Sequence, residues 1–219
     1  MCTAIFDENL LIMLRVLAFL TLAFFWYMML NIVWPYTSGE TDVDFLQTKQ
    51  HVIHLAHYRW AFYLHIFSSL YILAAGLTQF SDFTTKKNLF LHRWIGKGYV
   101  LLVLFVSAPA GFVMAYYANG NSSTQFSFML LSVLWFATTW KAYDVIKNQK
   151  NIEAHRRWII RSYALTLSAI TLRIMQFFIA NYVETISPEE AYNLIAYPSW
   201  VLNIVVGELY IRFSPTFRY

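Results

Sequence analysis

Long apolar stretches alternate with short polar ones along most of the chain. A helix needs about 20 mostly apolar residues to cross the hydrocarbon core of a bilayer, which is about 30 Å thick. Six stretches are long enough, at residues 10–34, 60–80, 94–117, 126–145, 158–182 and 197–213. None of them alternates apolar and polar residues as a membrane-spanning strand would. The pattern predicts an all-α integral membrane protein, with a single transmembrane domain over residues 1–219 built as a bundle of six transmembrane helices.

The charged residues between these stretches alternate in sign from loop to loop. Cations gather in two loops, at Lys86, Lys87, Arg93, Lys147, Lys150, Arg156 and Arg157. Acidic residues dominate two of the other loops, at Glu40, Asp42, Asp44, Glu184, Glu189 and Glu190. Short loops rich in Lys and Arg stay in the cytoplasm. We therefore expect a multi-pass protein of the bacterial cytoplasmic (inner) membrane with both termini cytoplasmic.

The composition indicates a lipid environment. Hydrophobic residues make up 58% of the chain and charged residues 13%, about half the share of a soluble domain. The net charge of +4 comes from loop cations that set topology, so we expect no nucleic-acid partner. The only cysteine, Cys2, excludes an internal disulfide. The expected partner is the lipid bilayer.

Polar side chains inside the predicted helices are candidates for function, because such groups are rare within a bilayer. Helix rise places them at two depths. The inner layer contains His92, Lys97, His155, Arg161 and Glu208, and the outer layer contains His65, Arg173, Gln176 and Asn203. Glu208 lies at a depth from which it can pair with Arg161 or Lys97. Arg173 requires an acceptor, a water-filled cavity or an anionic ligand.

Two short segments of the chain are similar to each other. They are His92-Arg93-Trp94-Ile95-Gly96-Lys97 and His155-Arg156-Arg157-Trp158-Ile159-Ile160-Arg161, and we call them the two motif copies. The charge alternation makes the helices that follow them parallel, so His92 and His155 lie at the same depth on the cytoplasmic side. A b-type haem takes two axial ligands from facing helices and cations for its propionates.

The motif copies therefore predict one haem b near the cytoplasmic face. His92 and His155 are the expected metal ligands, and the expected cofactor-binding cations are Arg93, Lys97, Arg156 and Arg161. The alternative is that both copies only anchor helix ends at the membrane interface, where Trp and Arg collect in any case.

Three further histidines, His51, His54 and His57, precede the second predicted helix. A helix there would place His57 on one face with His65, and such a group could bind zinc or copper. A solvated outer loop explains the first three equally well, so their role stays open. In the third predicted helix, Pro109 among small residues predicts a packing kink.

Several segments together carry a resemblance to a known family. They are Leu91–Tyr99, His155–Tyr163, Thr171-Leu172-Arg173, Ser199-Trp200, Asn203 and Glu208. From about His65 onward the chain resembles an uncharacterised family of predicted bacterial multi-pass membrane proteins, catalogued as a domain of unknown function. The resemblance implies a membrane bundle and no particular activity.

The segment His92–Gly96 is also similar to motifs at haem-ligating histidines. It looks like a motif of ferric-reductase-like membrane proteins and like the His-Ser-Trp-x-Gly motif of ascorbate-reducible transmembrane cytochromes b. Those families place two haems on four histidines. Here the fourth predicted helix has no histidine, and neither His92 nor His155 has a second one about four turns along its helix. This resemblance therefore implies at most one haem.

Three functions are compatible with these residues. The first is a membrane redox protein that binds one haem and exchanges electrons with a quinone or a larger membrane complex. The second is a transporter-like protein with a polar pathway along Arg173, Glu208 and His65, although no pair of broken helices in corresponding halves is visible. The third is a non-catalytic subunit whose polar side chains serve packing. Whether the chain is an enzyme stays open.

Overall fold

A computed structural model describes residues 2–79, 87–183 and 186–214, and this part of the chain is helical without β-strands. The all-α prediction is thus confirmed for the described residues. The α-helices are α1 (Cys2–Val33), α2 (Ala56–Gln79), α3 (Leu89–Leu102), α4 (Ala108–Tyr116), α5 (Ser122–Lys147), α6 (Ile152–Thr166), α7 (Ser168–Tyr182), α8 (Pro188–Ile195) and α9 (Pro198–Phe213). Two 3-10 helices, η1 (Trp34–Ser38) and η2 (Asp44–Lys49), follow α1, and a π-helical segment, η4 (Val103–Ser107), joins α3 to α4.

Five helical stretches of the described chain are long and apolar enough to cross a membrane. They are Val16–Ser38, Ala56–Gln79, Leu89–Tyr116, Ile152–Tyr182 and Glu189–Phe213. The predicted count of six is therefore not confirmed, because α5 is long but is not apolar enough to be among them. Phe80, the predicted end of the second helix, lies outside the described residues. The surface exposes many large apolar side chains, such as Phe105 and Tyr182, as a protein in contact with lipid does.

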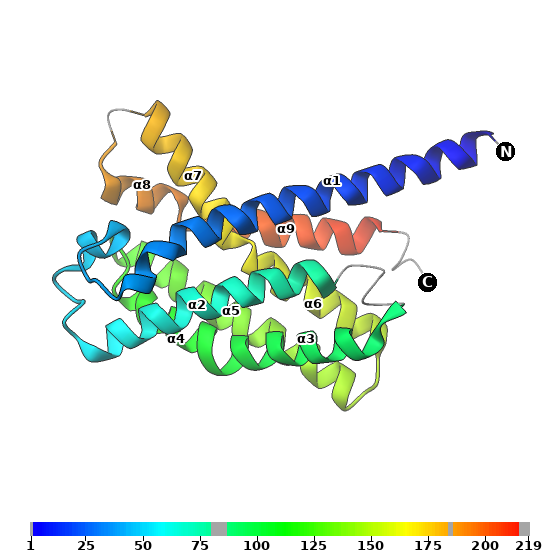
Figure 1. Ribbon diagram of the computed structural model, residues 1–219, viewed down its shortest axis with the longest axis horizontal. Coiled ribbons are helices and arrows are strands. Elements are labelled where there is room, and N and C mark those ends of the chain that lie inside the picture. The colour runs from blue at the N-terminus through cyan, green and yellow to red at the C-terminus, as the bar shows by residue number, and fades with distance from the viewer. Residues whose placement is uncertain (1, 80–86, 184–185, 215–219) are drawn as a thin grey trace.

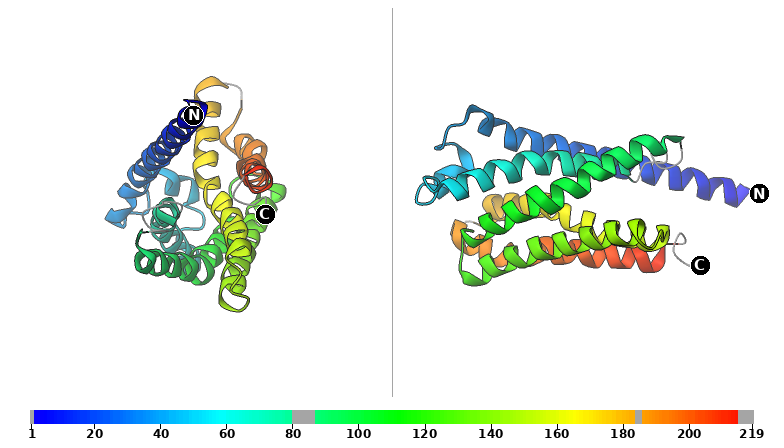
Figure 2. Two further views of the ribbon diagram at one scale, coloured as in Figure 1. Left: turned by 90° about the vertical axis from the view of Figure 1, so that its right-hand side faces the viewer. Right: turned by 90° about the horizontal axis from the view of Figure 1, so that it is seen from below.

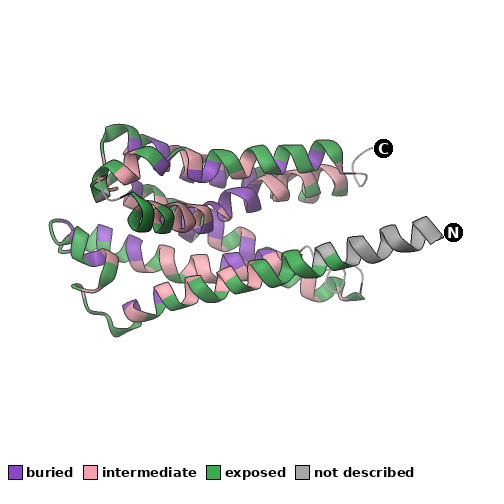
Figure 3. Ribbon diagram, turned by 90° about the horizontal axis from the view of Figure 1, so that it is seen from above, coloured by how far each residue is buried: buried purple, intermediate pink, exposed green. Residues whose placement is uncertain are grey.

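The long helices lie side by side in one bundle (Figures 1 and 2). α5 packs against both α4 and α6, while α9 packs against α6 and α7. α1 runs past the other helices and is exposed along most of its described length (Figure 3). The starts of α1, α3 and α6 and the end of α9 lie at one end of the bundle, which we call the motif end. η2, the α4–α5 connection and α8 lie at the opposite end, which we call the loop end.

Polar side chains of α5 are buried at the centre of the bundle and bonded to α6, which is in turn bonded to α3. The hydroxyl of Tyr99 lies 2.7 Å from that of Ser162, which lies 2.7 Å from the hydroxyl of Thr139. The indole of Trp135 donates to Thr166 at 3.0 Å, and Thr166 also lies 3.0 Å from the Tyr99 hydroxyl. Hydrogen bonds between helices stabilise membrane bundles in this way. The Ser and Thr residues that make α5 polar thus face the interior.

The third predicted helix is interrupted near its middle, where the sequence predicts a kink. η4 ends at Ser107, just before Pro109. Proline has no backbone N–H to donate and its ring crowds the preceding turn, so the helix loses its regular pattern there. The imidazole of His65 reaches the Ser107 carbonyl at 2.8 Å, and the hydroxyls of Ser68 and Ser69 lie 3.0 and 2.9 Å from the Ser107 hydroxyl.

The fifth predicted helix is also interrupted, since α6 ends at Thr166 and α7 begins at Ser168. The Ser168 hydroxyl donates to the Leu165 carbonyl at 2.6 Å, and such bonds compete with the helical pattern. Both interruptions follow a motif histidine by about three helical turns. Both long helices are thus irregular at corresponding positions, although each still forms one continuous stretch, Leu89–Tyr116 and Ile152–Tyr182. A single short side-chain bond of this kind leaves no signal in an apolar pattern.

The closest approach between α2 and α6 generates a testable prediction. A Cβ atom on Gly76 would lie 1.8 Å from the ring of Tyr163, whose hydroxyl is fixed to the Leu73 carbonyl. Gly76→Ala should therefore lower the free energy of unfolding by about 3 kcal/mol through overpacking. Gly207→Ala is the matched control, because its nearest contact, to Ala164, would be 3.3 Å. Thermal unfolding in detergent measures both, and equal losses would contradict the assigned packing.

Candidate functional site

Both motif copies open a helix at the motif end, and both use the same cap. The side chain of Asn88 accepts a hydrogen bond from the Leu91 amide at the start of α3. The side chain of Asn151 accepts one from the Ala154 amide at the start of α6. Each asparagine precedes its motif histidine by four residues. The similarity of the two copies therefore extends to the helix caps, a signal that N-cap preference could have revealed in the sequence.

The tryptophan of each copy carries a cation three residues further along the helix. The Lys97 ammonium lies 5.0 Å from the Trp94 ring, and the Arg161 guanidinium lies 4.7 Å from the Trp158 ring. Residues three apart share a helix face, so this stacking follows from the spacing. The stacking is common to both copies.

Glu208 pairs with Arg161 and not with Lys97, the other cation at the same depth. The Arg161 Nε and Nη2 atoms donate to the two carboxylate oxygens at 2.5 and 2.9 Å. This two-bonded pair joins α6 to α9. Arg157 also has a carboxylate partner, Glu153, one turn before it. The charges of Arg161 and Arg157 are therefore compensated within the protein.

The backbone of α5 orients the imidazole of His155. Its Nδ1 atom lies 2.8 Å from the carbonyl oxygen of Ala142. A carbonyl only accepts hydrogen bonds, so Nδ1 carries a proton, and in the neutral form of the ring the lone pair is on Nε2. The ring is thus held in the tautomer and orientation of a metal-ligating histidine, whose other nitrogen is bonded to a backbone carbonyl.

The imidazole of His92 is incompletely satisfied. Its Nδ1 atom is buried and has no hydrogen-bond partner among the described residues. The ring is within electrostatic range of His155, Arg156 and Arg93. Those residues come from both motif copies, so the fold brings the two copies together. We call His92, His155, Arg93 and Arg156 the motif-end site.

A second incompletely satisfied group borders the motif-end site at the end of α2. The amide nitrogen of Gln79 is buried and has no partner among the described residues. A Cβ atom on Gly96 would lie 3.1 Å from the Gln79 side-chain oxygen. His92 and Gly96 are one turn apart, so Gln79 lies beside the face of α3 that carries His92. Buried polar groups are normally bonded, and two exceptions in one place mark a candidate ligand site.

The outer polar residues are not part of the motif-end site. The ring of His65 is stacked edge to face with Trp135 at 6.4 Å, in the interior between the two helix breaks. A Cβ atom on Gly111 would come within 2.9 Å of this ring, so the glycine makes room for it. Asn203 bonds Thr171 at 2.9 Å and joins α9 to α7.

Arg173 lines a cavity instead of meeting a carboxylate. Its Nη1 atom donates to the side-chain oxygen of Gln176 at 3.0 Å. The cavity has a volume of about 410 Å³ and is lined by Arg173 together with Met28, Asn31, Ile32, Tyr36, Asp44 and Phe45. Among the described residues Arg173 has no ion-pair partner within 4 Å. The depth of Arg173 in the predicted helix implied that it needs a cavity or a ligand, and the fold places it at a cavity.

The three histidines before the second predicted helix do not form a metal cluster. His57 opens α2 and its Nε2 atom lies 2.8 Å from the Tyr117 hydroxyl, while His51 and His54 are exposed. No group of three or more potential ligands of the His, Cys, Asp or Glu type occurs in the described part of the chain. The zinc or copper hypothesis for these residues and His65 therefore has no structural support.

Comparison with known proteins places the chain among membrane proteins. The family model described as "Predicted membrane protein (DUF2306)" matches residues 62–211, which include both motif copies and all the outer polar residues. The resemblance to an uncharacterised membrane family is thereby confirmed. No curated protein and no solved structure gives a significant match. No comparison supports the likeness to ferric-reductase-like proteins.

The pair of Arg161 and Glu208 generates a prediction about stability. Their side chains are 23% and 46% exposed, so each of Arg161→Gln and Glu208→Gln should cost only about 1 kcal/mol. The double variant should cost less than the sum, because either single variant already breaks the pair. Chemical denaturation in detergent measures this coupling. Lys97→Gln is the control, and coupling of Lys97 to Glu208 instead would contradict the assigned pair.

Proposed function

Because the chain belongs to this family of predicted membrane proteins, whose activity is unknown, we propose its function from the motif-end site. The protein acts as a membrane redox protein that holds one b-type haem between α3 and α6. His92 and His155 provide the two axial ligands. The observation that carries the proposal is the buried, unbonded Nδ1 of His92 beside a His155 ring that α5 holds in a ligand orientation.

The state of His155 supports the proposal most directly. A ligand imidazole must present a lone pair, and the bond from Nδ1 to the Ala142 carbonyl leaves the lone pair on Nε2. The same bond fixes the plane of the ring before any ligand arrives. An outer hydrogen bond of this type also raises the basicity of the ligating nitrogen. His155 is therefore pre-oriented for an axial role.

The state of His92 adds an energetic argument. A buried nitrogen without a partner lowers the stability of the fold by about 1–3 kcal/mol, and such groups are rare in proteins. A ligand that engages the His92 ring, or an acceptor brought in with it, removes that cost. The buried amide nitrogen of Gln79 next to it can donate to the same ligand.

The number of available ligands favours haem over a bare metal ion. Zinc and copper sites of proteins usually use three or four side chains, and the described residues offer no such cluster. Haem brings four ring nitrogens of its own and needs only two axial ligands. Two histidines from facing helices are sufficient for it.

The cations of the two motif copies differ in whether they are available to bind the haem propionates. Arg161 is committed to Glu208, and Lys97 is stacked on Trp94 at the exposed rim. Arg93 and Arg156 are exposed, within range of His92, and have no ion-pair partner in the described chain. The proposal therefore assigns the propionates to Arg93 and Arg156 first.

The proposal includes a topology. α5 is a sixth crossing, because it runs beside α4 and α6 and its polar side chains are bonded inside the bundle. Loop cations at the motif end place that end, and both termini, in the cytoplasm of a bacterial cell with the bundle in the inner membrane. The haem then lies near the cytoplasmic face, where it supplies one-electron transfer to a quinone or to a larger membrane complex.

A second candidate function has one specific observation in its favour. The two helix irregularities lie in corresponding positions of the hairpins α2–α4 and α5–α7, and interrupted helices in corresponding halves are a feature of transporter folds. His65 and Trp135 lie between the two breaks. A polar pathway through this region is the alternative if the motif-end site binds no cofactor, and a packing role for these groups is the remaining one.

A visible spectrum tests the redox proposal. The protein purified in detergent from haem-supplied cells should show a Soret band and, after dithionite, the split bands of reduced haem b. His92→Ala and His155→Ala should each abolish nearly all of this absorbance, since each removes an axial ligand. His57→Ala, at the loop end, should leave it unchanged. A colourless native protein, or a spectrum that both motif variants keep, would exclude the proposed haem.

A further inference from the structure

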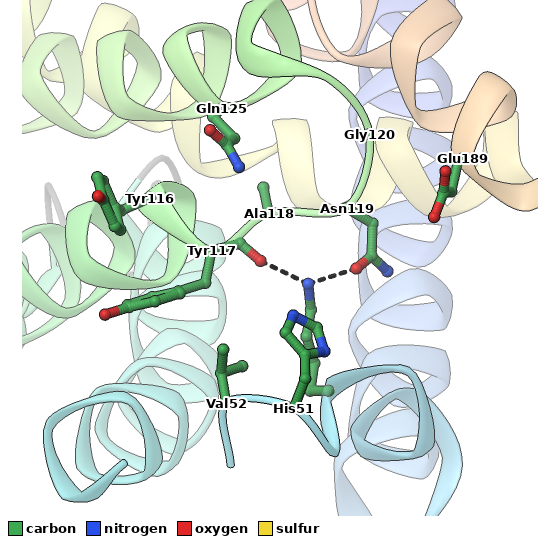
Figure 4. A pocket seen from close by; sticks show the side chains of 10 residues that line it. His51, Val52, Tyr116, Tyr117, Ala118, Asn119, Gly120, Gln125 and Glu189 are labelled. Carbon is green, nitrogen blue, oxygen red and sulfur yellow. Dashed lines mark hydrogen bonds between the residues drawn. The ribbon is translucent and has the colours of Figure 1, made fainter. Parts of the chain in front are cut away.

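A cavity of about 530 Å³ lies at the loop end, far along the bundle from the motif-end site (Figure 4). Its wall is formed by the end of η2, the α4–α5 connection and the starts of α5 and α8. The residues that matter for chemistry are Lys49, His51, Asn119, Gln125 and Glu189. None of them is used by the proposed redox function.

Lys49 is the most unusual residue of this cavity. It is a lysine at 1% exposure, and its Nζ atom donates to the Tyr117 carbonyl at 2.5 Å and to the side-chain oxygen of Asn119 (Figure 4). The ring of Phe45 lies 5.5 Å from the same nitrogen. All three partners are neutral, and the described residues place no carboxylate within 4 Å of it. The ammonium is therefore buried without a counter-charge.

Burial without a counter-charge affects the protonation of Lys49. It lowers the pKa of the Lys49 amine to about 8, because desolvation disfavours the charged form. Buried charges in proteins are normally paired, so an unpaired one beside a cavity is a candidate binding group for an anionic ligand. An ammonium has three N–H donors, and the two acceptors leave one of them for a ligand in the cavity.

The opposite charge is present on another wall of the same cavity. Glu189, in the first turn of α8, is exposed and has no ion-pair partner among the described residues. Gln125 and His51 supply further hydrogen-bonding groups on the cavity wall (Figure 4). A cavity with one unpaired cation and one unpaired carboxylate is complementary to a small molecule that carries both charges.

We propose that the loop-end cavity binds a small zwitterionic carboxylate, such as an amino acid, with its carboxylate on Lys49 and its ammonium on Glu189. The volume is ample for a molecule of that size. Gln125 donates to the carboxylate. The bonds from Lys49 to Tyr117 and Asn119 hold the amine in place before the ligand arrives, which limits the entropy lost on binding.

Thermal unfolding of the full chain in detergent tests the proposal. The probes are glycine, 4-aminobutyrate and 6-aminohexanoate, with acetate and ethylammonium at the same concentration as single-charge controls. At least one zwitterion should raise the unfolding midpoint, and the two controls should raise it by less than half as much. Equal shifts for acetate and the zwitterions would limit the site to a plain anion and overturn the assignment of Glu189, and the absence of any shift would overturn the site.

Two variants separate the roles of the charges. Lys49→Met should abolish the response to every carboxylate, and Lys141→Met, an exposed lysine on α5, is its matched control. Glu189→Gln should reduce the zwitterion response to the level of acetate. If Lys49→Met does not fold, the native protein still decides the matter: the bound zwitterion should slow amine-selective labelling of Lys49 relative to that of the exposed Lys141, measured by mass spectrometry, because reagent consumed by the free zwitterion slows both lysines alike. Unchanged labelling would contradict the proposal.

The pH dependence provides a further check. Only the charged amine attracts the carboxylate, so the affinity for the zwitterion should fall about tenfold for each pH unit above about 8. The other titratable groups that line the cavity are His51, Tyr116, Tyr117 and Glu189. An affinity that is constant between pH 8 and 10 would exclude Lys49 as the binding group.

Discussion

The fold depends on the need to bond the hydroxyls of α5 inside an apolar bundle. A hydroxyl that meets only lipid tails or hydrocarbon side chains costs several kcal/mol. The structure avoids this cost by turning Thr139 and Trp135 toward Tyr99, Ser162 and Thr166. These bonds fix the rotation of α5 relative to α3 and α6. The Ala142 carbonyl, one turn from Thr139, is thereby aimed at His155. The candidate haem ligand therefore owes its orientation to the packing of the core.

The sequence predicted the large features of the fold well, because they depend on properties that add up over many residues. Helix type, five of the spans and the irregular segment before Pro109 were all readable from apolar runs and one proline. The break at Leu167 was not, since it depends on how Ser168 and its neighbours bond the backbone. The status of α5 was also ambiguous. Its composition lies between that of a buried helix and that of a spanning one. The helices packed against it, which the sequence does not reveal, determine which of the two it is.

The candidate site was predictable in its location but not in its details. Two similar motif copies on parallel helices were sufficient to predict that His92 and His155 share one end of the bundle. Depth alone could not choose between Lys97 and Arg161 as the partner of Glu208, because both lie about one turn inside the membrane edge. The caps Asn88 and Asn151 were visible in the sequence and could have strengthened the repeat. The buried state of Lys49 was not visible, because η2 has no apolar pattern that indicates burial.

The polar face of α5 also has a consequence for how the protein is made. A helix that enters a bilayer alone must be apolar enough to remain there, and α5 is the long helix that fails this criterion. The bonds of Thr139 to Ser162 and of Trp135 to Thr166 form only when α6 is beside α5, and α6 is synthesised after it. In the proposed topology, in which α5 is a sixth crossing, α5 therefore stays with the insertion machinery, or against its earlier neighbours, until α6 has emerged. That topology implies cooperative insertion of several helices rather than a sequence of independent insertions.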